Sequence, residues 1–211
     1  MWRVGLLCVV AGYVDGFGYF ALGHVFAANM TGNTVLFAAA AGQGDWERAT
    51  RYGVTLGAFI VGSLAAAVLK RILRRHFMPL FMEAAVLALT YLPLAGELPA
   101  LVLLAIAMGL QGAAITRSGA VSAQTIVLTS TIIRFTEGAI DWVFPREETG
   151  ENTAAATTRV SALAWTAYAF GAGIGVAAIK VMRNPLIAPI LALLLLAIEM
   201  MVAGRPRPRA A

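Results

Sequence analysis

Charged residues are scarce in this chain of 211 residues: they make up 13% of it, against 60% for apolar residues. Soluble domains carry about 25% charged residues, which cover the surface with groups that water solvates. The composition therefore excludes an ordinary soluble globule, and the mean hydropathy of +0.79 agrees. The apolar surface that remains uncovered must face lipid.

Cysteine and the motifs of catalysis are nearly absent. The single cysteine, Cys8, excludes an internal disulfide and a paired-cysteine redox or zinc motif. A nucleophile elbow, a P-loop, an HExxH pair and a dinucleotide fingerprint are also missing from the sequence. His24 has no nearby residue in the sequence with which to share a metal. We therefore expect neither an enzyme nor a metal or other cofactor.

Apart from one polar segment at 144–157, the chain lacks long hydrophilic runs, and six apolar stretches approach the length of about 20 residues that crosses a bilayer. They cover residues 4–23, 52–69, 77–95, 98–116, 159–179 and 186–203. The first has no signal-peptide cleavage site, so we expect it to be retained. The sequence predicts an all-α, polytopic membrane protein with about six transmembrane helices, forming a single transmembrane domain over 1–211.

The basic residues cluster at the ends of the apolar stretches and predict the orientation. With six spans both termini share one side, and that side receives twelve of the sixteen Lys and Arg residues. The run KRILRRH at 70–76 contributes most. We therefore expect both termini in the cytoplasm. Because the net charge of +5 forms no basic face, we expect no nucleic-acid partner.

The two halves of the chain resemble each other. The run AFIVG at 58–62 recurs 111 positions later as AFGAG at 169–173, and a glycine that precedes a Thr-rich stretch (Gly12) recurs about 97 positions later (Gly109). Three spans per half is an odd number, so the second half enters the membrane from the opposite side. We predict two inverted three-helix repeats, over about 1–96 and 97–204. The alternative is chance similarity between helices rich in Ala and Gly.

Two shorter apolar stretches, 25–41 and 120–135, are rich in Thr, Ser, Asn and Gln. Each is predicted to be a short polar broken-helix segment, the first with its break at Gly32, and exposed backbone groups there would line a cavity. The alternative for each hydroxyl is an ordinary hydrogen bond to the helix backbone one turn back.

Asp15 lies inside the first span, where a carboxylate costs about 2.5–3.5 kcal/mol, so it must face a partner or a wet cavity. A pairing with Arg134 would relieve the burial cost of both. Glu83 and Glu199 lie in the third and sixth spans, where each is either a proton carrier or close to an interface. The candidate substrate-binding residues are Asp15, Asn29, Thr31, Asn33, Thr34, Gln111, Thr125, Thr129, Thr131 and Arg134.

The stretch GYVDGFGYFALGHVFAANMTGNTVLF, at 12–37, resembles the first signature of the YoaK-like family of bacterial multi-pass membrane proteins. That signature has a Gly-Tyr-x-Asp start and an Ala-Asn-Met-Thr-Gly-Asn core. The second signature, Gly-Leu-Gln followed by Thr-x-x-x-Thr-Gly-Thr and an Arg, is similar to 109–111 and 125–134, with Ser130 in place of the usual Gly. The resemblance covers nearly the whole chain. It implies a bacterial inner-membrane location and supplies no substrate.

The sequence supports two functions. A transporter or channel for a small polar solute or ion, with Asp15 as counter-charge or proton carrier, follows from the buried carboxylate, the paired polar stretches and the repeat. A non-transporting membrane scaffold or assembly protein would use the polar groups only to hold helices together. It predicts a dry centre with Asp15 hydrogen-bonded inside the protein. Both leave room for a homo-oligomer.

Overall fold

The computed structural model describes residues 1–73, 77–93, 96–115 and 151–203. Within these ranges the secondary structure is entirely helical, as predicted. The helices are α1 (Trp2–Ala21), α2 (Met30–Gly42), α3 (Trp46–Leu73), α4 (Met78–Leu89), α5 (Glu97–Ile115), α7 (Glu151–Val181) and α8 (Ile187–Ala203). Every expected span corresponds to one of these helices, and α2 is the additional one.

The exterior of the helices fits a membrane. Trp2–Ala21, Trp46–Leu69 and Arg159–Val181 are long and apolar enough to cross one, whereas Met78–Leu89, Glu97–Gly112 and Ile187–Ala203 are apolar but shorter. Large apolar side chains are exposed along α3, α7 and α8, among them Ile60, Leu64, Phe170, Leu191 and Leu195. A membrane protein is therefore supported, while the number of six spans stays a prediction.

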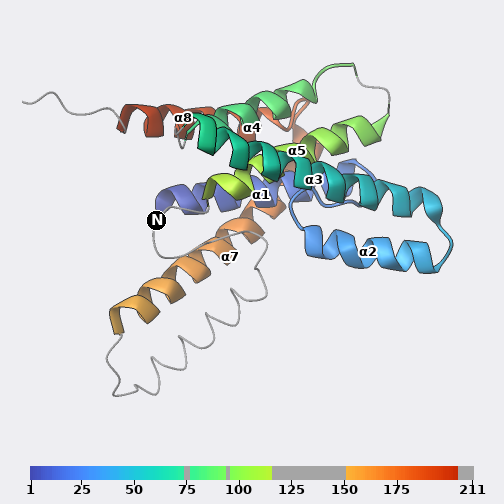
Figure 1. Cartoon of the computed structure of the whole chain (residues 1–211), viewed down its shortest axis with the longest axis horizontal. Helices are drawn as coiled ribbons and strands as arrows, with labels where there is room; N and C mark the ends of the chain where they lie inside the picture. Colours follow the sequence, from blue (N-terminus) through green and yellow to red (C-terminus); the bar gives the residue numbers. More distant parts are fainter. Residues whose placement is uncertain (74–76, 94–95, 116–150, 204–211) are drawn as a thin grey trace, which may run out of the picture.

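When α2 is left out, successive helices alternate in direction along the chain (Figure 1). α1, α4 and α7 run away from the end of the molecule where the N-terminus lies, and α3, α5 and α8 run back toward it. α1 and α5, the first helices of the two expected halves, therefore point in opposite directions. The end of α8 returns to the start of α1, where Glu199 and Arg3 form an ion pair of 2.7 Å.

Two helix boundaries differ from the expected spans. α4 ends at Leu89, well before residue 95, because the Thr90 hydroxyl donates to a carbonyl of the last turn (2.6 Å) and Pro93 cannot continue a helix. α3 begins at Trp46, before residue 52, because Asp45 accepts a hydrogen bond from an amide of its first turn (3.1 Å).

α1 and α7 cross with their backbones in direct contact. A Cβ atom placed on Gly12 would lie 2.0 Å from the carbonyl oxygen of Tyr168, and one placed on Gly171 would lie 2.1 Å from that of Val9. Only a hydrogen atom fits at such positions. Small residues permit this close approach, which gives van der Waals contact where lipid removes the hydrophobic drive between helices.

α3 and α5 cross in the same way. A Cβ atom on Gly62 would lie 2.2 Å from the carbonyl oxygen of Ile106, and one on Gly109 would lie 2.3 Å from that of Phe59. The hydroxyl of Ser63 also donates to the carbonyl of Gly109 (3.3 Å). The α3–α5 crossing therefore uses one glycine from each helix against the partner's backbone. The α1–α7 crossing uses two, because Gly16 and Gly175 also lie against backbone carbonyls of the partner helix.

The contact positions of the α1–α7 crossing correspond to those of the α3–α5 crossing when the two expected halves are compared. The contact positions of α5 lie 97 residues after those of α1, and those of α7 lie 109 residues after those of α3. The equivalent pairs are Val9 and Ile106, Gly12 and Gly109, Phe59 and Tyr168, and Gly62 and Gly171. The two crossings thus agree at these four positions. The further close contacts of Gly16 and Gly175 in the α1–α7 crossing have no glycine counterpart in α5 and α3.

The sequence match between α3 and α7 differs by two positions from the match of their packing contacts. The sequence match pairs Gly62 with Gly173, yet the packing equivalent of Gly62 is Gly171. A Cβ atom on Gly173 would meet nothing within 4 Å among the described residues. The misleading match includes Phe170, which is exposed, whereas Phe59 packs against the core. A shared pattern of residues therefore does not identify the contact face.

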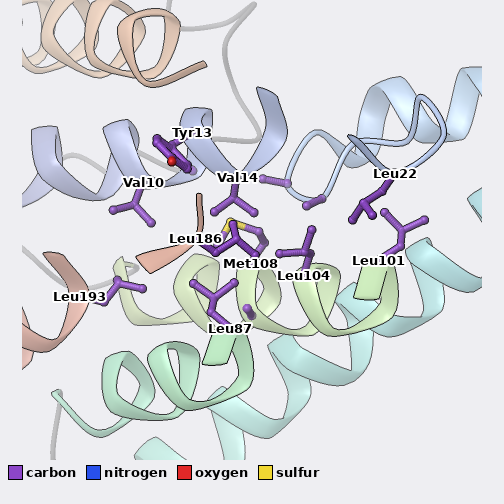
Figure 2. Close-up of a cluster of buried hydrophobic side chains, with 14 of the residues drawn as sticks. Val10, Tyr13, Val14, Leu22, Leu87, Leu101, Leu104, Met108, Leu186 and Leu193 are labelled. Atoms are coloured by element: carbon purple, nitrogen blue, oxygen red, sulfur yellow. The ribbon is translucent and has the colours of Figure 1, made fainter. Parts of the chain in front are cut away.

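The apolar core lies where α5 is packed between α1 and α4 (Figure 2). Val14 of α1 faces Leu104 and Met108 of α5, and Leu87 of α4 contributes from the opposite side. Leu193 of α8 extends the same cluster. The core therefore joins helices from both expected halves.

The glycine crossings predict a contrast within single helices. Gly62→Ala should lower the free energy of unfolding by about 1–3 kcal/mol, because a backbone oxygen cannot move aside. Gly57→Ala, in the same helix with open space around it, should keep or raise stability, since alanine favours a helix by about 1 kcal/mol over glycine. Gly171→Ala and Gly173→Ala should show the same contrast in α7. Unfolding of the purified variants in detergent micelles measures it, and equal stabilities within each pair would contradict the close crossings.

Candidate functional site

α1 stops at Ala21, and the chain then folds back alongside it. Gly23 (φ 81°) and His24 (φ 61°) both adopt the left-handed conformation, and the His24 amide donates to the carbonyl of Tyr19 (3.0 Å). Such residues end a helix because they turn the backbone out of its path. Glycine adopts this conformation freely, whereas a histidine there is strained. Residues 22–29 form the non-helical link between α1 and α2.

Most of the link is buried even though it is not helical. Val25, Ala27 and Ala28 are almost completely shielded from solvent. Buried peptide groups cannot rely on water, and in a membrane interior each needs a partner within the protein. Two side chains, Asp15 and Asn33, supply partners to backbone groups of the link.

Asp15 joins three parts of the molecule. It lies less than two turns before the end of α1 and is 2% exposed. Its Oδ1 accepts a hydrogen bond from the Ala28 amide (2.5 Å). Its Oδ2 accepts a hydrogen bond from the Tyr168 hydroxyl of α7. Donors rather than lipid surround the carboxylate, which is the environment that a charge requires in a membrane.

Asn33, near the start of α2, hydrogen-bonds to the backbone of the link. Its side-chain amide donates to the Phe26 carbonyl (2.7 Å), and its Oδ1 accepts from the Phe26 amide (3.0 Å). Both backbone groups of Phe26 are thereby satisfied by one side chain. Asn29 caps α2 by accepting a hydrogen bond from the Gly32 amide (3.3 Å).

The predicted break at Gly32 is wrong. α2 runs without interruption from Met30 to Gly42, and the break precedes Asn29. Gly32 is small for another reason: a Cβ atom on it would lie 3.0 Å from the side-chain nitrogen of Asn29 and 3.2 Å from the ring of Phe26. Gly32 leaves room for the helix cap and for the link.

Two of the candidate residues of α2 point away from the link. Thr31 and Thr34 are exposed, and the Thr34 hydroxyl donates to the carbonyl of Met30 (2.9 Å). This contact is the ordinary hydrogen bond of a helical threonine to the preceding turn. Of the candidates in the first half, the structure brings together Asp15, Asn29 and Asn33.

Gln111 is buried in a different place. Its side-chain amide donates to the carbonyl of Leu7 (2.6 Å), about two turns before Asp15 in α1. Its Oε1 is buried and has no hydrogen-bond partner in the part of the chain that the structure describes. The remaining candidates lie outside the described residues, so the pairing of Asp15 with Arg134 stays a prediction; they are Thr125, Thr129, Thr131 and Arg134.

The sequence reasoning did not identify Tyr168, the partner of Asp15. A tyrosine within an apolar span is a usable signal, because a buried hydroxyl needs an acceptor. Tyr13 behaves in the same way, since its hydroxyl donates to the carbonyl of Pro185 between α7 and α8 (2.6 Å). Both tyrosines connect α1 to the second half of the chain.

An ion pair lies beside Gly23, at the exposed end of the link. Arg51 of α3 and Glu97 of α5 are 3.0 Å apart, and a Cβ atom on Gly23 would lie 2.5 Å from the Arg51 guanidinium. The pair is partly exposed, so it is worth at most about 1 kcal/mol. It nevertheless bridges helices of both expected halves above the point where the chain turns back.

The link yields a prediction for Asn33. Asn33→Ala leaves the amide and carbonyl of Phe26 without partners, and each unsatisfied buried group costs about 1–3 kcal/mol. Thr34→Ala, one residue later, removes only an exposed hydroxyl and should change stability by no more than about 0.5 kcal/mol. Unfolding in detergent, together with hydrogen exchange of the link amides, measures both effects. Equal stability and equal exchange in the two variants would mean that Asn33 does not hold the link.

Comparisons with known proteins agree with this architecture. A family model described as "Protein of unknown function (DUF1275)" matches residues 4–199. The chain is 31% identical over 180 residues to the UPF0700 transmembrane protein YoaK of Bacillus subtilis (strain 168), covering 80% of this chain and 79% of that protein. No solved structure matches the chain. The expected resemblance to YoaK is confirmed, and the protein is a membrane protein that belongs to the DUF1275 family.

Proposed function

We propose that the protein is a transporter for a small polar solute or ion, built from two inverted three-helix halves. The observation that carries this proposal is the match at four equivalent positions between the α1–α7 and α3–α5 crossings. In each crossing the first expected span of one half packs against the second expected span of the other. In secondary transporters with inverted repeats, one repeat or bundle moves against the other around the solute site.

The third helices support the same symmetry. α4 and α8 pack against each other, and their buried faces agree at a spacing of 110 positions. The equivalent buried pairs are Pro79 and Pro189, Glu83 and Leu193, and Leu87 and Ala197. Each described helix except α2 then has an equivalent in the other half.

The link supplies the polar site of this transporter. In inverted-repeat transporters, broken helices at the repeat interface bind the solute or the coupling ion. Asp15 hydrogen-bonds to the link of the first half and to Tyr168 of the second. A solute or ion that competes for these donors would loosen the connection between the halves, and this is the role that we assign to Asp15.

The orientation completes the proposal. The excess of Lys and Arg on the side of the termini supports a location of both in the cytoplasm of a bacterial inner membrane. In that orientation the link and the Arg51–Glu97 pair lie toward the outer side, and the Arg3–Glu199 pair toward the cytoplasm. Among the described residues, each side then has one ion pair between helices.

A second function has one specific observation in its favour. Both carboxylate oxygens of Asp15 accept hydrogen bonds inside the protein, as a non-transporting membrane scaffold or assembly protein would require. In that case the link is only a structural joint. The two functions differ in whether removal of the Asp15 charge changes solute movement or stability alone.

Flux through proteoliposomes tests the proposal with Asp15→Asn. The probes are a panel of radiolabelled amino acids, sugars, nucleosides and carboxylates, each measured with and without a proton gradient. Asparagine keeps an acceptor for Ala28 but removes the charge, so flux should fall by about tenfold or more, equivalent to about 1.4 kcal/mol of lost coupling. Thr34→Ala is the control and should transport at the wild-type rate.

The same experiment separates the two functions. Transport by Asp15→Asn at the wild-type rate under every gradient would remove Asp15 from the mechanism. Absence of flux for every probe and for inorganic ions, with a loss of stability in Asp15→Asn, would favour the scaffold.

A further inference from the structure

Glu83 is fully buried and has no hydrogen-bond partner among the described residues. It lies in the second turn of α4, on the face formed by Leu80, Ala84 and Leu87 that packs into the core. Its exposed fraction is 0%, and neither Oε atom forms a hydrogen bond within the described ranges. A buried carboxylate normally requires hydrogen-bond donors. Asp15 has them, whereas Glu83 has none among the described residues.

No charge from the neighbouring helices compensates Glu83. α4 packs against α3, α5 and α8. Glu97 of α5 is engaged with Arg51 of α3, and Glu199 of α8 is engaged with Arg3. The other charged residues of α3 lie toward its two ends, at Glu47, Arg48, Lys70 and Arg71. Among the described residues, Glu83 therefore faces no opposite charge.

An ionised carboxylate cannot persist in such surroundings. The free energy of burying an unpaired charge is so large that a group of this kind takes up a proton instead. The neutral acid still lacks a hydrogen-bond partner, which costs about 1–3 kcal/mol, but this is a far smaller penalty. Glu83 is therefore neutral when α4 is packed as in this structure, and it can ionise only if water or a donor reaches it.

The equivalent position in the other half shows that the fold does not need an acid there. At the spacing of 110 positions that relates α4 to α8, Glu83 corresponds to Leu193, which is also fully buried. Leucine is what the packing of this position favours. The carboxyl group of Glu83 thus breaks the symmetry of the core at a cost in stability, which indicates a role other than packing.

We infer that Glu83 is a proton-binding site, occupied when α4 and α8 are packed together and emptied when this interface opens to water. Uptake transfers one proton from water to an Oε atom, and release returns it, leaving a hydrated carboxylate. The inference rests on the proposed function only where it couples the proton to transport. Binding of the proton to Glu83 is tested independently of transport.

Infrared spectroscopy of the full chain in lipid nanodiscs tests the protonation state. A neutral carboxyl group has a C=O stretching band that a carboxylate lacks. At neutral pH the wild type should show this band, and Glu83→Gln and Glu83→Leu should both lose it. Glu199→Gln, which removes a carboxylate paired with Arg3, should retain it. Identical spectra for the wild type and both Glu83 variants would overturn the inference.

Unfolding measurements distinguish a proton site from a structural carboxyl group. Glu83→Leu should be at least as stable as the wild type, because it installs the residue that the other half has at this position. A large loss of stability in Glu83→Leu, without one in the conservative Glu83→Gln, would mean that the polar atoms have partners and would overturn the inference.

Flux measurements then test the coupling. With whichever probe the wild type carries, a proton gradient should accelerate wild-type transport, and Glu83→Gln should lose this acceleration. An infrared band together with a complete absence of transport would retain the proton site while rejecting the transporter. Transport of Glu83→Gln that still follows the gradient would reject Glu83 as the coupling site.

Discussion

A peptide group that is buried away from water must be hydrogen-bonded, and inside a membrane a helix is the simplest way to achieve this. The link at 22–29 departs from the helix in a buried position. It is stable because Asp15 and Asn33 replace the missing backbone partners at Ala28 and Phe26. These polar side chains are therefore required by the backbone around them, whatever the function of the protein.

The same constraint connects the link to the helix crossings. Asp15 reaches Tyr168 only because α1 and α7 lie close enough for their backbones to touch at Gly12 and Gly171. The hydrogen bond from Tyr168 to the Asp15 carboxylate thus depends on a glycine one turn away in each helix. Since α3 and α5 repeat this crossing without an equivalent acid, the two halves share a packing scheme but differ in their polar groups.

The sequence was sufficient for the features that are set by composition and periodicity. Apolar length predicted the long helices. An acid within an apolar span predicted that Asp15 would face a partner or a wet cavity, and the structure supplies partners. The position of the break was not predictable, because Gly32 is a glycine for steric reasons while Gly23 and His24 end the helix. The sequence match between α3 and α7 likewise did not identify the packing contacts. Glycines that touch a neighbouring helix look the same in the sequence as glycines that do not.

The two buried carboxyl groups illustrate why partners matter more than burial. Asp15 and Glu83 are almost equally shielded, but Asp15 accepts hydrogen bonds from Tyr168 and Ala28, whereas Glu83 meets none in the described ranges. A carboxylate surrounded by donors can remain charged and hold a structure together. A carboxyl group without donors must be neutral, and it changes charge only when the packing around it changes. The protonation of such a group is therefore coupled to the separation of α4 and α8. A transporter built from two inverted halves would need one half to move against the other.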